Sequence, residues 1–236
     1  MELRLDSRPL QEAFSQATEL LKDRRIVVVF GDRLALVAFS LIEPVRSSLL
    51  GAATTEEEGF ELVLRTKPDL LICSSDLETG YGINLLRRVK VELPTCKLLI
   101  VLLRETQASV QEALQAFADG VIFKSSLGTG HGDLISAFNT IAAGGVYFPE
   151  EIRRLASTLE ARSDLPPLVE ELTPREQQVV AAVARGLKNT SIADVLGVSV
   201  ETVKTHVGNA MDKLGARDRT QMAVTALLYG LIDPLS

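Results

Sequence analysis

The sequence predicts two domains: an α/β domain with a doubly wound, five-stranded parallel sheet, and a smaller domain made only of helices. Two observations lead to this prediction. Short apolar runs alternate with helical patterns over the first two thirds of the chain, whereas the last third shows helical spacing alone. With 236 residues, of which 46% are hydrophobic, the chain is long enough to give each domain a core.

The first domain is built on short apolar segments of the kind found in strands that are buried on both faces. Four of these segments are clear, and a weaker one lies between the first two. They cover residues 25–30, 48–53, 70–73, 97–103 and 120–123. Because helical segments separate them, the strands are expected to run parallel, and the working groups of such a sheet lie at the carboxyl ends of its strands.

The last third of the chain contains the strongest local signals. Thr173, Pro174 and Glu176 form the start of a helix, with a capping box between the threonine and the glutamate. A short helix then ends at Gly197, where a turn is expected, and Ser199 can cap the helix that follows. Two helices joined in this way are typical of a helix-turn-helix, which places its second helix in the major groove of DNA.

The second helix of this pair has two faces. Its buried face is predicted to consist of Val200, Val203, Val207, Met211 and Leu214. Its polar face carries Glu201, Lys204, Thr205, Gly208, Asn209 and Asp212. In a major groove, the residues nearest the start of such a helix reach the bases.

Three successive motifs in this region resemble the LuxR/FixJ (NarL) type of DNA-binding domain. They are Leu-Thr-Pro-Arg-Glu at 172–176, Gly-Leu-x-Asn-x-x-Ile-Ala at 186–193 and Ser-x-x-Thr-Val-Lys-Thr-His at 199–206. The resemblance implies a four-helix module whose last helix, at about 220–230, helps to pair two copies on DNA. It also implies that Lys204 and Thr205 contact bases, and that the residues near the phosphate backbone are Asn189, Thr202 and His206.

The chain departs from the family pattern at two places. Gly208 stands where family members often carry a longer contact residue, which predicts that this helix reads fewer bases. Residues 188–191 lack the usual serine-to-glutamate capping box, so the start of the first helix of the pair is less well fixed.

The charge of the helical domain is unusual for a DNA-binding protein. From residue 170 to the end there are seven Lys and Arg against eight Asp and Glu, although between 185 and 219 the balance is six against four. The phosphate contacts would have to come from Lys188, Lys204, Lys213, Arg217 and Arg219. We therefore expect weak non-specific binding with a modest dependence on salt.

The α/β domain resembles the receiver domain of response regulators, which has a flavodoxin-like fold. The residues that carry the resemblance are Pro68-Asp-Leu-Leu-Ile, Gly82, Ala113-Leu-Gln-Ala116, Lys124 and Ala142-Ala-Gly-Gly-Val-Tyr-Phe-Pro149. Receivers take phosphate on an aspartate, and they need an acidic pair that holds a divalent cation, a hydroxyl group and a lysine.

Most of the residues for this chemistry are missing. The acidic pair falls on Gly31 and Asp32, the nucleophile on Ser74, the hydroxyl on Leu102 and the lysine on Lys124. A serine cannot form an acyl phosphate, and one carboxylate is a poor magnesium site. The sequence therefore predicts a pseudo-receiver with a degenerate phosphorylation site, in which Asp32 and Lys124 pair with each other. Residual phosphorylation at Asp76 is the alternative.

An apolar helix near the start of the chain indicates that something packs on it. The predicted helix at 34–42 has Ser40 as its only polar residue, so it needs cover on both sides. The segment at 9–22 carries an amphipathic stripe of Leu10, Phe14, Ala17, Leu20 and Leu21. We expect this segment to cover the helix, within the chain or across a homodimer. A solvated leader helix is the alternative.

The predicted organisation is an N-terminal helical extension at 1–24, a receiver-like domain at 25–155, a linker at 156–169 and a helix-turn-helix domain at 170–236. The chain has no run of eighteen apolar residues and its start is not a signal peptide, so a cytoplasmic protein is expected. Cys73 and Cys96 form no disulfide framework, and neither a metal nor a cofactor is expected.

These observations predict a sequence-specific transcription regulator that is not an enzyme. It would bind double-stranded DNA as a homodimer and would be controlled without phosphorylation. The alternative is an adaptor that binds a histidine kinase or RNA polymerase through the pseudo-receiver and uses the helical domain mainly to dimerise.

Overall fold

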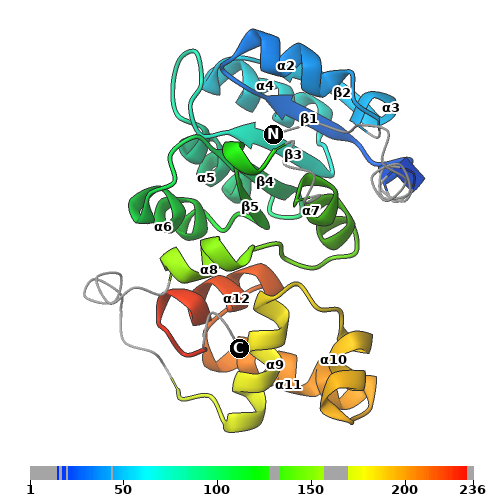
Figure 1. Cartoon of the computed structure of the whole chain (residues 1–236), viewed down its shortest axis with the longest axis vertical. Helices are drawn as coiled ribbons and strands as arrows, with labels where there is room; N and C mark the ends of the chain where they lie inside the picture. Colours follow the sequence, from blue (N-terminus) through cyan, green and yellow to red (C-terminus); the bar gives the residue numbers. More distant parts are fainter. Residues whose placement is uncertain are drawn as a thin grey trace.

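A computed structural model shows an α/β domain and a helical domain in contact with each other (Figure 1). It describes residues 15, 18–19, 21–43, 45–127, 133–156 and 170–232. Most of the linker predicted at 156–169 lies outside the described residues. So does the greater part of the predicted N-terminal stripe, namely Leu10, Phe14, Ala17 and Leu20.

The first domain contains the predicted five-stranded parallel sheet, with the strand order β2-β1-β3-β4-β5. Its strands are β1 (Ile26–Val29), β2 (Leu49–Ala53), β3 (Leu70–Ser74), β4 (Lys97–Leu102) and β5 (Gly120–Phe123). Each apolar segment that was predicted to be a strand forms one, including the weaker segment at 48–53. The strand order reverses between β1 and β3, and in sheets of this kind the functional groups gather at the carboxyl edge near such a point.

Helices cover both faces of the sheet because each strand is apolar on both sides. The first face packs against α2 (Arg33–Ser40), α3 (Val45–Ser48) and α7 (Asp133–Ala142). The second face packs against α4 (Glu56–Thr66), α5 (Gly82–Glu92) and α6 (Gln107–Gln115). In β1, for example, Val28 faces the first core and Val27 the second. A short 3-10 turn, η1 (Lys124–Ser126), follows β5.

A helix that the sequence analysis did not predict, α8 (Glu150–Ala156), follows the sheet domain. It begins with two glutamates and has two arginines in its last turn, an arrangement that suits the helix dipole. The helix includes residue 156, where the linker was expected to begin.

The helical domain follows the predicted pattern closely. It consists of α9 (Pro174–Ala184), α10 (Asn189–Leu196), α11 (Val200–Lys213) and α12 (Arg219–Leu228). The capping box of Thr173 and Glu176 is present, and Gly197 ends α10 in the left-handed conformation with φ of 64°. Ser199 caps α11, since its hydroxyl accepts a hydrogen bond from the backbone N–H of Thr202 at 3.0 Å.

The apolar contacts run without a break from the sheet domain into the helical domain. Helix α12 lies against α6 and α8 as well as against α9 (Figure 1). Its buried residues are Thr220, Met222, Ala223, Val224, Ala226, Leu227 and Leu228. The two domains are therefore docked through α12, which the sequence alone did not indicate.

The predicted apolar helix near the N-terminus is α2, and its outer face is open among the described residues. Leu34, Val37 and Leu41 are 80%, 56% and 63% exposed. Leu21, from the end of the N-terminal extension, is buried, and its carbonyl oxygen accepts a hydrogen bond from the Ser48 hydroxyl at 2.8 Å. Coverage of α2 by the extension stays a prediction.

Candidate functional site

The outer face of α11 presents the residues that were predicted to read DNA. These four are all exposed: Lys204, Thr205, Gly208 and Asn209. The Lys204 ammonium lies 3.1 Å from the Glu201 carboxylate, and both side chains are largely in solvent. Such an exposed pair is weak, so the lysine can exchange it for an acceptor on a base or phosphate.

The start of α11 is held firmly. The hydroxyls of Ser199 and Thr202 lie 2.8 Å apart, in addition to the cap on the Thr202 N–H. His206, one turn further, is half-buried at the border of the exposed face. Thr202 and His206 therefore flank the face that carries Lys204.

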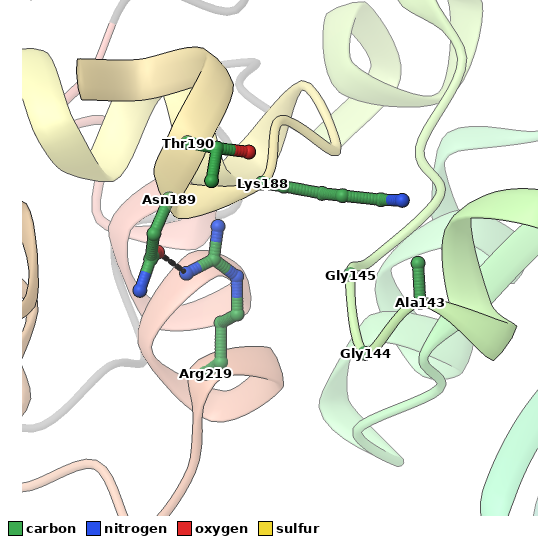
Figure 2. A pocket seen from close by; sticks show the side chains of 7 residues that line it. All are labelled: Ala143, Gly144, Gly145, Lys188, Asn189, Thr190 and Arg219. Atoms are coloured by element: carbon green, nitrogen blue, oxygen red, sulfur yellow. Dashed lines mark hydrogen bonds between the residues drawn. The ribbon is translucent and has the colours of Figure 1, made fainter. Parts of the chain in front are cut away.

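The start of α10 has no side-chain cap, as the sequence predicted. Lys188 at the N-cap position is exposed, and Arg219 reaches over from α12 to donate a hydrogen bond to Asn189 Oδ1 at 2.8 Å (Figure 2). Burial lowers the pKa of Arg219 to about 10, which leaves its guanidinium charged at neutral pH. Two cations and the positive end of a helix dipole thus meet here, an environment that suits a phosphate group.

A cleft of about 340 Å³ separates this end of α10 from a turn of the sheet domain. It is lined by Ala143, Gly144, Gly145, Lys188, Asn189, Thr190 and Arg219. Figure 2 shows the Lys188 side chain extending across the cleft toward the glycine turn. Sequence reasoning missed this cleft because it exists only when the domains are docked.

Lys213, another predicted DNA contact, is engaged within the domain. Its ammonium lies 3.0 Å from the Glu176 carboxylate, and the lysine side chain is only 18% exposed. The same carboxylate accepts the Thr173 N–H at 2.8 Å. Burial raises the pKa of Glu176, but the hydrogen bonds from Thr173 and Lys213 outweigh it and hold the pKa below its ordinary value. The Lys213 ammonium is therefore held by a partner within its own domain.

The residues of the predicted degenerate phosphorylation site lie together at the carboxyl edge of the sheet. Ser74 ends β3 and is buried, and its hydroxyl donates to the carbonyl oxygen of Asp76 at 2.6 Å. Leu102 ends β4 as a fully buried apolar side chain, whereas Lys124 is exposed in η1. A cavity of only about 60 Å³ remains between Asp32, Ser74, Asp76, Lys124 and their apolar neighbours.

The space beside Gly31 is filled by backbone. A Cβ at this position would lie 2.6 Å from backbone atoms of Leu77 and 2.7 Å from the N atom of Glu78. That loop is held in place, because the Glu78 N–H donates to the Thr54 carbonyl at 2.9 Å and its carboxylate lies 3.0 Å from the Arg33 guanidinium. A carboxylate at position 31 would need the loop to move.

The predicted ion pair between Asp32 and Lys124 is not formed in the described part of the chain. Asp32 instead caps α2, where its carboxylate accepts the Ala35 N–H at 3.0 Å. This hydrogen bond is the main cause that lowers the pKa of Asp32, and the charge of Lys124 adds a smaller effect. The Asp32 carboxylate therefore caps the N-terminus of α2 instead of pairing with Lys124.

A network around Tyr81 also holds the loop that follows β3. The Tyr81 hydroxyl donates to the Glu112 carboxylate at 2.9 Å, and its backbone N–H donates to Glu56 at 3.0 Å. Burial, with a smaller contribution from Glu112, raises the pKa of Tyr81 to about 12. A side chain on Gly82 would place its Cβ 1.9 Å from the Ser74 carbonyl oxygen, so the helix start and strand end can meet only at glycine. Sequence reasoning missed the network because it joins three separate helices.

Metal binding and membrane insertion find no support in the described ranges. No three His, Cys, Asp or Glu side chains gather there as possible metal ligands. None of the helices in those ranges combines the length and hydrophobicity that a bilayer crossing requires. Cys73 and Cys96 are both buried, and burial raises the pKa of each thiol.

Comparison with known proteins agrees with this architecture. Residues 170–226 match the family described as bacterial regulatory proteins of the luxR family. The chain is 30% identical over 186 residues to the response regulator protein VraR of Staphylococcus aureus strain Mu3, a match that covers 78% of this chain and 86% of VraR.

Two solved structures share the fold. RcsB from Salmonella enterica serovar Typhimurium, bound to promoter rprA with the phosphomimetic BeF3−, has a TM-score of 0.51 at 21% identity and covers 89% of this chain and 100% of its own. A LuxR-family two-component response regulator from Aurantimonas sp. SI85-9A1 has a TM-score of 0.50 at 23% identity, covering 56% and 95%. On the strength of the VraR and luxR-family matches, the chain belongs to the LuxR family of response regulators, which are DNA-binding transcription regulators and not enzymes.

Proposed function

We propose that this protein is a sequence-specific transcription regulator that binds double-stranded DNA as a homodimer and whose receiver domain accepts no phosphate. The observation that carries the proposal is the backbone of Leu77 and Glu78 filling the space beside Gly31. A receiver that cannot hold the first carboxylate of the acidic pair cannot bind magnesium in the usual way.

The other residues of this edge support the same conclusion. Ser74 has no carboxylate to form an acyl phosphate, and its hydroxyl is already bonded to the Asp76 carbonyl. Asp76 is the nearest alternative carboxylate, and it faces Arg104 at 3.9 Å. Asp32 is used as a helix cap. Control by a partner, by a ligand or by protein abundance takes the place of phosphorylation.

The proposed DNA contacts are divided between two helices. Lys204 and Thr205 on the exposed face of α11 contact the bases, and Gly208 and Asn209 add little because they are small or short. The phosphate backbone is held by Lys188, Asn189, Thr202 and His206. One solved relative, RcsB, is seen as two dimers on two parallel DNAs, and we propose a dimer on DNA for this chain also.

Binding of the full-length protein to a genomic fragment library, across a salt series, tests the DNA contacts. We expect enrichment of a two-fold motif and a loss of about 10- to 100-fold in specific affinity in Lys204→Ala. Lys22→Ala is the matched control, because Lys22 is similarly exposed at 65% and also faces a glutamate three residues away. Binding without any enriched motif would favour an adaptor that uses the helical domain to dimerise.

Treatment with acetyl phosphate and magnesium tests the receiver. Intact-mass spectrometry should show no added phosphate on the full chain, and DNA affinity should not change. Acid-labile phosphate at Asp76 or Asp32 would contradict the proposal.

A further inference from the structure

The exposed face of α11 carries a carboxylate directly beside its lysine. Glu201, in the first turn of the helix, is 79% exposed, and its carboxylate lies 3.1 Å from the Lys204 ammonium. The Thr205 hydroxyl donates to the carbonyl oxygen of Glu201 at 3.0 Å, so that hydroxyl is already engaged. The residues nearest the start of a recognition helix are the ones that reach base edges. Glu201 therefore lies where it can contact the same bases as Lys204.

This face has no excess of positive charge. Its charged side chains are Glu201, Lys204 and Asp212, because Lys213 at the end of the helix is held by Glu176. A carboxylate that enters the groove loses water and costs free energy unless it gains a hydrogen-bond donor. The ammonium has three N–H donors, so it can hold Glu201 and a base acceptor at the same time. The two side chains thus present a donor and an acceptor next to each other.

This arrangement matches the major-groove edge of a G·C base pair. Guanine O6 is an acceptor and cytosine N4 is a donor, and because they are hydrogen-bonded to each other they lie about 2.9 Å apart. The distance of 3.1 Å between the Lys204 ammonium and the Glu201 carboxylate is close to this separation. With the ammonium on guanine O6 and N7, the carboxylate meets the cytosine amino group.

The other three base pairs fit the two groups less well. An A·T pair offers adenine N7 to the lysine, but it places the thymine O4 acceptor against the carboxylate. A C·G pair opposes both groups, and a T·A pair places adenine N7 beside the carboxylate. Lys204 alone would accept any of the acceptors on guanine, adenine or thymine. The carboxylate therefore adds a discrimination that the lysine does not have.

We infer that Glu201 is a specificity-determining residue, which accepts a hydrogen bond from cytosine N4 in the base pair whose guanine Lys204 contacts and excludes an A·T pair at that position. The inference rests on the proposed function, in which Lys204 contacts bases, and it adds the base pair that is read and an acidic contact. The helical domain has no basic excess. Its specificity then comes from matching donors with acceptors in the groove more than from attraction to phosphates.

A double-mutant cycle between protein and DNA tests the contact. The DNA is the motif that the full-length wild type enriches, with each cytosine replaced in turn, in both half-sites, by deoxyzebularine, an analogue that lacks the 4-amino group. One replacement should weaken binding of the wild type by about 5- to 100-fold, the range for a base contact. In Glu201→Ala the same replacement should change the affinity by less than about twofold, because its acceptor is already absent.

Selection from the fragment library gives a second readout. Glu201→Ala should enrich the wild-type motif except at one base pair, where A·T now appears beside G·C. The matched control is Asp212→Ala, which removes an exposed carboxylate from the same face three turns further along α11 and should leave that base pair unchanged. A role of Glu201 limited to the helix dipole would change the stability of α11 but not the base preference.

The inference is overturned if no cytosine shows this coupling, or if Glu201→Ala selects the same motif as the wild type. A motif that is lost in Lys204→Ala but unchanged in Glu201→Ala leaves the proposed function in place and removes only the role of Glu201. If the wild type enriches no motif at all, the proposed function fails and the inference with it.

Discussion

The two edges of the same sheet differ sharply in this protein. At the carboxyl edge, Ser74 and Asp32 satisfy their polar groups with the nearest backbone, and a loop fills the space beside Gly31. At the amino edge, the buried Asp119 joins residues of β4, α5 and α12 in one network. The carboxyl edge, where we propose that the phosphorylation residues are lost, is therefore held by local contacts, whereas the amino edge is held by contacts between separate elements.

The physical reason for the difference is the cost of a change at each edge. Groups that bond to their own loop can be replaced one at a time, because each replacement disturbs only local contacts. Removal of the buried Asp119 carboxylate alone is costly, since Lys97 would lose its counter-charge and Lys90 would keep only Asp218. The comparison leads to four predictions, three about the two edges and one about the helical domain.

The largest expected effect is at the amino edge. Asp119→Ala should lower the free energy of unfolding by about 3–5 kcal/mol, because it leaves Lys97 without its carboxylate and Lys90 with only the more distant Asp218, at 3.8 Å. Ser74→Ala at the carboxyl edge should cost about 1 kcal/mol, the net value of one local hydrogen bond. Urea denaturation of the full chain, followed by circular dichroism, measures both. A loss at Ser74 equal to that at Asp119 would remove the distinction between the edges.

The second largest effect on stability is expected at Gly31, where backbone fills the space that a side chain would need. Gly31→Ala should lower the free energy of unfolding by about 1–3 kcal/mol, because its Cβ collides with backbone that cannot easily shift. Gly208→Ala is the opposite case, since a Cβ there meets nothing within 4 Å and α11 gains a better helix former. It should raise the stability by about 0.5–1 kcal/mol. Equal unfolding midpoints for the two variants would show that the loop at 77–78 yields.

In the helical domain, the stabilising effect of Glu176 should depend on pH. Glu176→Gln should lower the stability by about 1–2 kcal/mol at neutral pH, because the carboxylate bonds both Thr173 and Lys213. The pKa of Glu176 is below its ordinary value of 4.5 in the folded protein. Its stabilising effect is therefore fully present above that value and is lost as the pH falls through the lower, folded pKa. Denaturation curves of both proteins should converge in acid, and a constant difference down to low pH would contradict this assignment.

The last prediction is that Ser74→Asp does not change the response to acetyl phosphate. Ser74→Asp places a carboxylate at the predicted nucleophile position but leaves the space beside Gly31 filled, so we expect magnesium to lack its ligands. Intact-mass spectrometry after treatment with acetyl phosphate should show no phosphate on this variant. If phosphate does appear, the loop at 77–78 opens readily. The absence of an aspartate at position 74 would then be sufficient to explain why the wild type accepts no phosphate.

Local signals in the sequence determined most of the secondary structure and the family. The apolar runs became the five strands, and the caps at Thr173 and Ser199 formed as expected, because strand burial and helix caps depend on residues close together in the chain. The same holds for the exposed face of α11, since helical spacing alone separates Lys204 from Val203.

Only the tertiary structure decided how these parts act on one another. Helix α8 and the docking of α12 were not expected, and Lys213 and Asp119 have partners that no local pattern indicates. Each of these contacts depends on which elements pack together, and Thr220 and Asp119 are 101 residues apart. Spacing along the chain reports the faces of a helix or strand, but the choice between two partners for one buried charge is made by the packing around it.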